Sequence, residues 1–272
     1  MNLSEMRLVQ AALAGVLLAV TSTAALAAGN GWLDGPWRFR ALGYGWAPEA
    51  PATIKLDQQE VANLPENLDT ILDGLDMAAM LEFEAHKGRL GFFLSPVYYK
   101  GRVSEHFKGP TGQNRKLTVK EEVWLVDYGV GWDLGPWELG TQAAPVLTLT
   151  PFVGARYFHD PIEMKVAPGE LDKGLDEKIT VRFNTPFVGA KAAVKLSDQW
   201  DFAVEADHGV FDSTKVNKTW QTMGAVNYNF KMGDLASRVV VGYRYLSLDL
   251  KNHPIEVKVD IKGPFVGFGV DF

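Results

Sequence analysis

The sequence predicts an all-β fold, a closed antiparallel transmembrane β-barrel of about ten strands, with eight or twelve as alternatives. Three observations predict it. Segment after segment alternates between apolar and polar or glycine residues, which is the period of a β-strand. The connections between these segments alternate between long and short, as in transmembrane barrels. The last stretch, 264–272 (PFVGFGVDF), is apolar at every second residue and ends on Phe272.

The first residues have the pattern of a secretory signal peptide. A basic residue, Arg7, precedes an apolar core at 11–20, and Ala25-Leu26-Ala27 fits a small-x-small cleavage site. The apolar core is too short for a spanning helix. We therefore expect residues 1–27 to be cleaved, which leaves 28–272 as one barrel domain. The sequence contains no Cys, and this excludes a lipoprotein anchor and disulfides.

Composition narrows the class of protein further. The formal net charge is −6 and basic blocks are absent, so we expect no nucleic-acid partner. The 8 Trp, 8 Tyr and 15 Phe suit aromatic girdles at two membrane interfaces.

The first predicted strand, 37–46, has an ambiguous facing. Regular alternation would place Arg38 and Arg40 on the same face of the strand as the apolar residues Leu42, Tyr44 and Trp46. A bulge near Ala41 would move the two arginines to the opposite face. The next stretch, 47–75, is predicted to be a long acidic loop with a short helix. The helix is predicted by the spacing of four apolar residues, Leu68, Ile71, Leu72 and Leu75.

The next segments are clearer. Residues 76–87 alternate, a Lys87-Gly88-Arg89 turn follows, and 90–104 forms the returning strand. In 117–134, two Trp bracket an apolar run on one face, which indicates a lipid-facing band between two interfaces. Further strands are predicted at 145–157, 179–196, 200–211, 219–232 and 238–250, with the last starting near Glu256.

Charged residues fall on the face opposite the apolar one, which in a narrow barrel is the lumen. Because unpaired charges there would be costly, we expect them to pair across the lumen and occlude it. The predicted lumen ion-pair network is Glu82, Glu84, Asp127, Arg156, Lys191, Lys195, Asp201, Glu205, Asp207 and Arg244. The predicted aromatic girdle is Trp124, Trp132, Trp200, Trp220, Tyr243 and Tyr245.

The last strand resembles the C-terminal signature strand of Gram-negative outer-membrane β-barrels, of the small OmpA/OmpW-like kind. The resemblance implies that Phe272, Val270 and Phe268 form a signal for the barrel-assembly machinery. It also implies an outer-membrane location with both termini periplasmic, and outer-membrane lipid and lipopolysaccharide as partners. A soluble lipocalin-like barrel is the alternative; the terminal Phe, the Gly-rich polar faces and the aromatics at band ends argue against it.

The sequence contains no recognisable signature of a barrel enzyme. Asp207 and His208 are adjacent in a strand, so they point to opposite faces and cannot form a dyad. Loop histidines 106, 159 and 253 could converge with Asp160, but their spacing matches no ligand motif. We predict no catalytic residues, no metal site and no cofactor.

Two function classes follow. The first is a non-enzymatic barrel with an ion-paired, largely occluded lumen that serves envelope structure or binding by its surface loops. The second is a narrow, porin-like channel for small solutes. A barrel enzyme acting on lipid or peptide at the outer rim is a distant third. Two acidic loops, 47–75 and 159–177, could hold divalent cations that bridge to lipopolysaccharide, although simple solvation also explains them. The sequence identifies no surface ligand.

Overall fold

The computed structural model describes residues 33–56, 59–64, 73, 75–108, 114–140, 145–166, 175–209, 216–252 and 255–272. The chain divides into two units, 1–34 and 35–272, and the fold described below is that of the second. The predicted signal peptide, 1–27, lies outside the described residues. No helix in the described part of the chain is long and apolar enough to cross a membrane.

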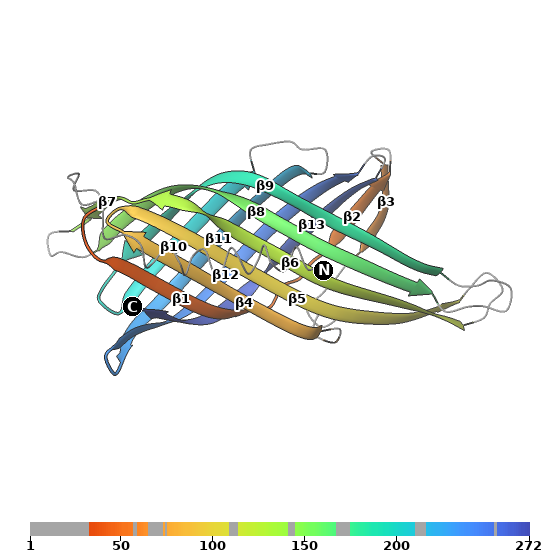
Figure 1. The fold of residues 1–272 in the computed structure, drawn as a ribbon, viewed down its shortest axis with the longest axis horizontal. Helices are drawn as coiled ribbons and strands as arrows, with labels where there is room; N and C mark the ends of the chain where they lie inside the picture. The colour runs from red at the N-terminus through yellow and green to blue at the C-terminus, as the bar shows by residue number, and fades with distance from the viewer. Residues whose placement is uncertain are drawn as a thin grey trace, which may run out of the picture. The chain divides into compact units, whose positions relative to one another are not determined.

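Unit 35–272 is a single antiparallel sheet (Figure 1). Its strands are β1 (Trp37–Trp46), β2 (Ala52–Leu56), β3 (Gln59–Leu64), β4 (Leu75–Lys87), β5 (Leu90–Lys108), β6 (Asn114–Trp132), β7 (Leu134–Glu138), β8 (Val146–Val166), β9 (Leu175–Lys195), β10 (Trp200–Gly209), β11 (Val216–Met232), β12 (Leu235–Asn252) and β13 (Ile255–Asp271).

Ten of these strands form the barrel wall. Their order is β1-β4-β5-β6-β8-β9-β10-β11-β12-β13, and pairing of β1 with β13 closes the ring. The predicted closed barrel of ten strands is confirmed. The short turns 88–89, 196–199 and 233–234 lie at the end that carries Trp37 and Phe272, which we call the terminal end. The last residue of β8, Val166, and the first residue of β9, Leu175, lie at the other end, which we call the loop end.

Three short strands were not anticipated. The predicted loop after β1 contains β2 and β3, which pair with each other, and β2 extends the sheet beside the loop-end half of β13. In Figure 1, β2 and β3 stand at the end opposite the C-terminus. Strand β7 pairs with the start of β8. The predicted loop helix lies mostly outside the described residues, and Leu75, its last apolar position, is instead the first residue of β4.

The predicted bulge near Ala41 is wrong. β1 runs in unbroken register with β4 from Trp37↔Lys87 to Gly43↔Leu81, and also with β13. Leu42 and Trp46 are buried, 6% and 9% exposed, on the same inward face as Arg40. The conflict disappears because the lumen contains apolar as well as charged side chains.

The outer face carries a continuous apolar band. Phe202, Val226, Val241 and Val266 are neighbours on four successive strands, and they are 40%, 43%, 56% and 57% exposed. Val130, Val153 and Val188 are similarly exposed on β6, β8 and β9. A soluble protein rarely exposes so large an apolar surface, whereas a barrel in lipid requires one.

On the inner wall, phenylalanine rings lie over glycines of the neighbouring strand. Phe93 is paired with Gly129, Phe187 with Gly154, and Phe265 with Gly242. A Cβ built on Gly129 would collide with the Phe93 ring and with the Val153 carbonyl oxygen. Glycine therefore lets a ring lie flat on the wall of a narrow barrel, an arrangement known to support edge and wall glycines.

Replacement of Gly129 by alanine is expected to destabilise the barrel by about 1–3 kcal/mol, since a backbone carbonyl cannot move aside as a flexible side chain can. Gly224→Ala is the matched control, because a Cβ there meets nothing within 4 Å. Urea unfolding followed by tryptophan fluorescence measures both. Equal stability of the two variants would contradict the packing described here.

Candidate functional site

The loop-end half of the lumen is filled by apolar side chains. Phe158 and Phe183 stack with their ring centroids 5.1 Å apart, and Leu125, Leu246 and Leu248 are at most 3% exposed. Four of them lie one inward position beyond the charged residues of their own or the neighbouring strand, on the loop-end side, and Leu248 lies two positions beyond Arg244. These residues form an apolar plug, which the sequence analysis did not anticipate, although Leu125 shares the parity of Asp127.

A buried ion-pair centre lies immediately below the plug. Arg156, on β8, is 0% exposed. It donates to both carboxylate oxygens of Asp127 on β6, at 2.8 and 3.1 Å, and to Asp207 on β10 at 3.0 Å. A fourth hydrogen bond, 2.8 Å long, goes to the Thr219 hydroxyl. Two carboxylates and a hydroxyl oxygen thus accept hydrogen bonds from a guanidinium that is fully buried.

Arg244 links this centre to the opposite wall. From β12 it donates to Asp127 at 3.3 Å, to Gln221 at 2.8 Å and to the Tyr44 hydroxyl at 3.1 Å. Its guanidinium carbon lies 5.0 Å from the centroid of the Trp46 ring, within cation–π range. Strands β6 and β12 are five places apart in a ring of ten, so this contact crosses the full lumen.

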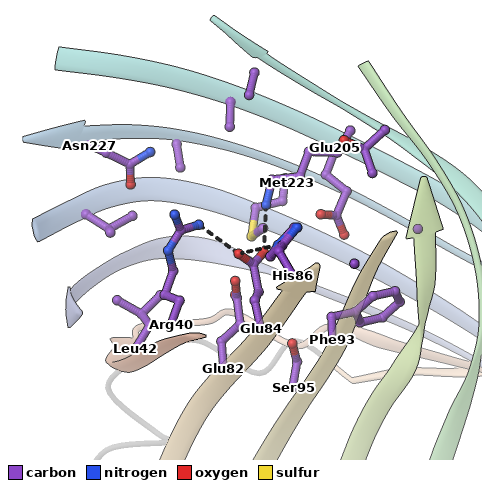
Figure 2. Close-up of a pocket in the computed structure, with 18 of the residues that line it drawn as sticks. Arg40, Leu42, Glu82, Glu84, His86, Phe93, Ser95, Glu205, Met223 and Asn227 are labelled. Carbon is purple, nitrogen blue, oxygen red and sulfur yellow. Dashed lines mark hydrogen bonds and ion pairs between the residues drawn. The ribbon is translucent and has the colours of Figure 1, made fainter. Parts of the chain in front are cut away.

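A second group of charges lies nearer the terminal end. Glu84 accepts from Arg40 at 2.7 Å (Figure 2), and it also accepts from Lys191 at 2.9 Å. Arg40 also donates to Asp271 at 2.7 Å, and Arg238 holds the other oxygen of that carboxylate at 2.6 Å. These bonds connect β1, β4, β9, β12 and β13, so they tie the walls together at a second level.

A cavity of about 900 Å³ occupies the terminal-end half of the lumen. Its inner end is lined by Asp127, Asp207 and Arg244, and its outer end by residues such as Asp198 and Phe272. The cavity is therefore a polar vestibule that ends at the buried ion-pair centre.

The structure brings six of the ten predicted lumen residues into these two groups. They are Glu84, Asp127, Arg156, Lys191, Asp207 and Arg244. Glu82 and Glu205 line the vestibule, and within the described residues neither has an ion pair. Lys195 and Asp201 do not belong to the network. Lys195 pairs with the turn residue Asp198 at 2.8 Å, and Asp201 accepts from Asn227 and Asn229.

Sequence reasoning missed several members of the two groups. Arg40 was noted but its facing was unresolved, while Tyr44, Gln221, Arg238 and Asp271 were not assigned to the lumen. Arg40, Leu42 and Trp46 are separated by even numbers of residues, so they lie on one face of the strand. This pattern would have placed Arg40 in the lumen if apolar side chains had been expected there.

Of the candidate histidine sites, the structure describes the Asp207–His208 pair and part of the loop-histidine group. Asp207 is buried and His208 exposed, on opposite faces of β10. His159 stacks toward Tyr157, with centroids 6.4 Å apart, and the adjacent Asp160 is 8% exposed on the inner face. The His106 side chain and residue 253 lie outside the described part. Within the described part, no group of three or more His, Asp or Glu side chains could hold a metal ion.

Four of the six predicted girdle residues contact other aromatic rings. Trp124 lies 4.6 Å from Tyr98, Trp220 stacks on Tyr245 at 4.6 Å, and Trp200 lies 4.9 Å from Tyr228. Among the other two predicted residues, Tyr243 is 51% exposed and Trp132 is partly buried. In the predicted assembly signal, Phe268 and Phe272 are 43% and 66% exposed and Val270 is partly buried. Their role in assembly stays a prediction.

No protein-family model and no curated protein matches the chain. Among solved structures, the outer membrane protease OmpT from Escherichia coli is similar, with a TM-score of 0.51 and 8% identity over 90% of this chain and 99% of that one. The translocator domain of NalP from Neisseria meningitidis matches at 0.39 and 11% identity, covering 97% of each chain. Ail of Yersinia pestis matches at 0.33 and 12% identity, covering 87% and 98%. At these identities the likeness is one of fold: this chain has the fold of a Gram-negative outer-membrane β-barrel.

Proposed function

We propose that this chain is a non-enzymatic barrel of a Gram-negative outer membrane, with both termini periplasmic and a lumen closed at its centre. The observation that carries the proposal is the pair of cross-lumen contacts, from Arg244 to Asp127 and from Lys191 to Glu84. Each joins walls that are four or five strands apart. A closed barrel of this kind would serve envelope structure, or it would bind a partner through surfaces that face the outside of the cell.

Three features support closure over steady conduction. The Arg156 guanidinium has every contact inside the protein, so an ion passing the centre would have to break charge-assisted hydrogen bonds. The apolar plug lies beyond it and offers no polar groups to a hydrated ion. Separation of either arginine from its acids would leave buried charges unpaired, which costs several kcal/mol.

A narrow channel for small solutes is the second candidate. The vestibule of about 900 Å³ favours it, because the cavity is large enough for a small molecule and is lined by charged side chains. In that case the ion-pair centre would be a gate, and some signal would have to displace Arg244. The enzyme alternative has weaker support, since Asp207 is engaged with Arg156 and His208 faces away.

Conductance across planar lipid bilayers tests the proposal. Purified wild-type barrel is expected to give little or no steady current, because the lumen is closed at two levels. Arg244→Gln removes the contact to the far wall and is expected to give brief openings. Lys195→Gln is the control, since Lys195 pairs only with a turn residue, and it should remain silent. Stable single-channel steps from the wild type would overturn closure and favour the channel.

A further inference from the structure

Two carboxylates in the vestibule have no partner in the protein. Glu82, on β4, and Glu205, on β10, line the cavity, and in the described part of the chain neither side chain makes an ion pair or a hydrogen bond. Strands β4 and β10 are five places apart in the ring of ten, so the two acids come from opposite walls. Figure 2 shows both side chains pointing into the space between those walls.

The bases that act electrostatically on these two acids are bonded to other groups. Lys191 and Arg40 both donate to Glu84, at 2.9 and 2.7 Å. Arg244 donates to Asp127 at 3.3 Å. Because an unpaired carboxylate in a narrow lumen is costly, a cation that entered between the two walls would be stabilised there.

The vestibule as a whole is short of positive charge and of hydrogen-bond donors. Nine carboxylates line it, against six Lys and Arg side chains, and Arg156 behind its inner end adds one more base. Asp207, at the inner end, is 6% exposed. Its Oδ2 accepts from Arg156, whereas its Oδ1 is buried and accepts from no group in the described part of the chain. A ligand that carries positive charge and N–H donors would supply both.

Apolar side chains share the walls of the vestibule with these acids. Phe93, Phe152 and Phe187 pack on one another with ring centroids 5.6 to 6.3 Å apart, and all three line the cavity. Met223, the cross-strand partner of Glu205, lies beside that acid in the cavity wall (Figure 2). Aromatic faces attract organic cations, and apolar walls stabilise a carbon chain that leaves water.

A metal ion fits this lining less well than an organic cation does. Calcium and magnesium ions require several oxygen ligands around one point. Within the residues that the structure describes, no group of three or more His, Asp or Glu side chains is arranged to hold one. An alkyl ammonium group has three N–H donors, which two or three separate acceptors can satisfy, and it brings a carbon chain for the apolar wall.

From these observations we propose that the vestibule binds a small aliphatic amine in its protonated form. Glu82 and Glu205 accept from its ammonium groups, and the three phenylalanine rings line the space for its carbon chain. A cavity of about 900 Å³ has room for such a molecule, and it opens at the terminal end, where Asp198 is 97% exposed. With the orientation proposed above, the amine comes from the periplasm. Binding does not require the lumen to conduct.

Isothermal titration calorimetry of the purified barrel in detergent tests this, with 1,4-diaminobutane as the probe and 1,4-butanediol as its neutral comparison. The wild type is expected to bind the diamine and not the diol. Glu82→Gln combined with Glu205→Gln should bind the diamine at least about tenfold more weakly. Glu163→Gln combined with Asp176→Asn removes two carboxylates at the loop end, outside the vestibule, and should bind like the wild type. Equal loss in both double variants, equal binding of the diol, or no binding of the diamine by the wild type would overturn the proposal.

Stability without the amine gives a second readout. Glu82→Gln combined with Glu205→Gln should unfold at the same urea concentration as the wild type or at a higher one, since it removes two unpaired charges. A clearly destabilised double variant would mean that these acids have partners in the protein, and would count against the site. A wild type that binds the diamine and also conducts steadily would overturn closure alone, whereas a silent wild type that binds no diamine would overturn the amine site alone.

Discussion

Arg156→Leu is expected to lower the free energy of unfolding of the barrel by about 3–5 kcal/mol, because it leaves Asp207 buried without its partner and Asp127 with only its 3.3 Å contact to Arg244. The guanidinium is 0% exposed and makes four hydrogen bonds, all of which the substitution removes. Urea unfolding of the barrel in lipid vesicles, followed by tryptophan fluorescence, measures the loss.

The matched control removes the charge that the arginine balanced. Arg156→Leu combined with Asp207→Asn should recover a large part of the lost stability, since a buried amide costs less than a buried carboxylate and Asp127 keeps its contact with Arg244. The same comparison in bilayers should show brief openings for the single variant, because the repelled acids no longer hold the walls together. A single variant within about 1 kcal/mol of wild type would show that the centre does not hold the lumen closed.

Val241→Arg is expected to cost about 2–4 kcal/mol, since it places a charge in the lipid-facing band. Val241 is 56% exposed and lies between Val226 and Val266 on the adjacent strands, within a row that has no polar side chain. An arginine there could reach water only by distorting the lipid around it. Refolding yield into vesicles and urea midpoints both report the cost.

Asp234→Arg is the control, because Asp234 lies in the exposed β11–β12 turn at the terminal end. It changes the charge by more than the Val241 substitution does, yet should leave the midpoint within experimental error of wild type. If Val241→Arg were equally harmless, the apolar row would not face lipid, and the barrel would have to be soluble.

The residues of a strand that point to lipid and those that point to the lumen could be predicted from the sequence wherever one face of the strand was entirely apolar and the other was not. In β6, Trp124 and Tyr128 alternate with Asp127 and Gly129, and the structure keeps that division. In β1 the inward face mixes Arg40 with Leu42 and Trp46, and the same rule produced a bulge that does not exist. The failure arose because an occluded lumen combines ion pairs with apolar packing, while the rule expected a purely polar interior.

Pairing inside the lumen could not be predicted in the same way. Alternation places Arg156, Lys191 and Lys195 on one face, but a partner depends on depth in the barrel and on which strands stand opposite. Lys191 reaches Glu84 across four places in the ring, while Lys195, four residues along β9, lies at the rim and pairs with Asp198.

The sequence by itself determined the strands of the barrel wall, most of the lipid-facing residues and the sign of most lumen charges, because these follow from a two-residue period within each strand. Only the tertiary structure decided which charges meet and that an apolar plug stands above them. Those features depend on register and ring closure. Register couples residues that are far apart in the chain, such as Asp127 and Arg244, and no local pattern carries that information.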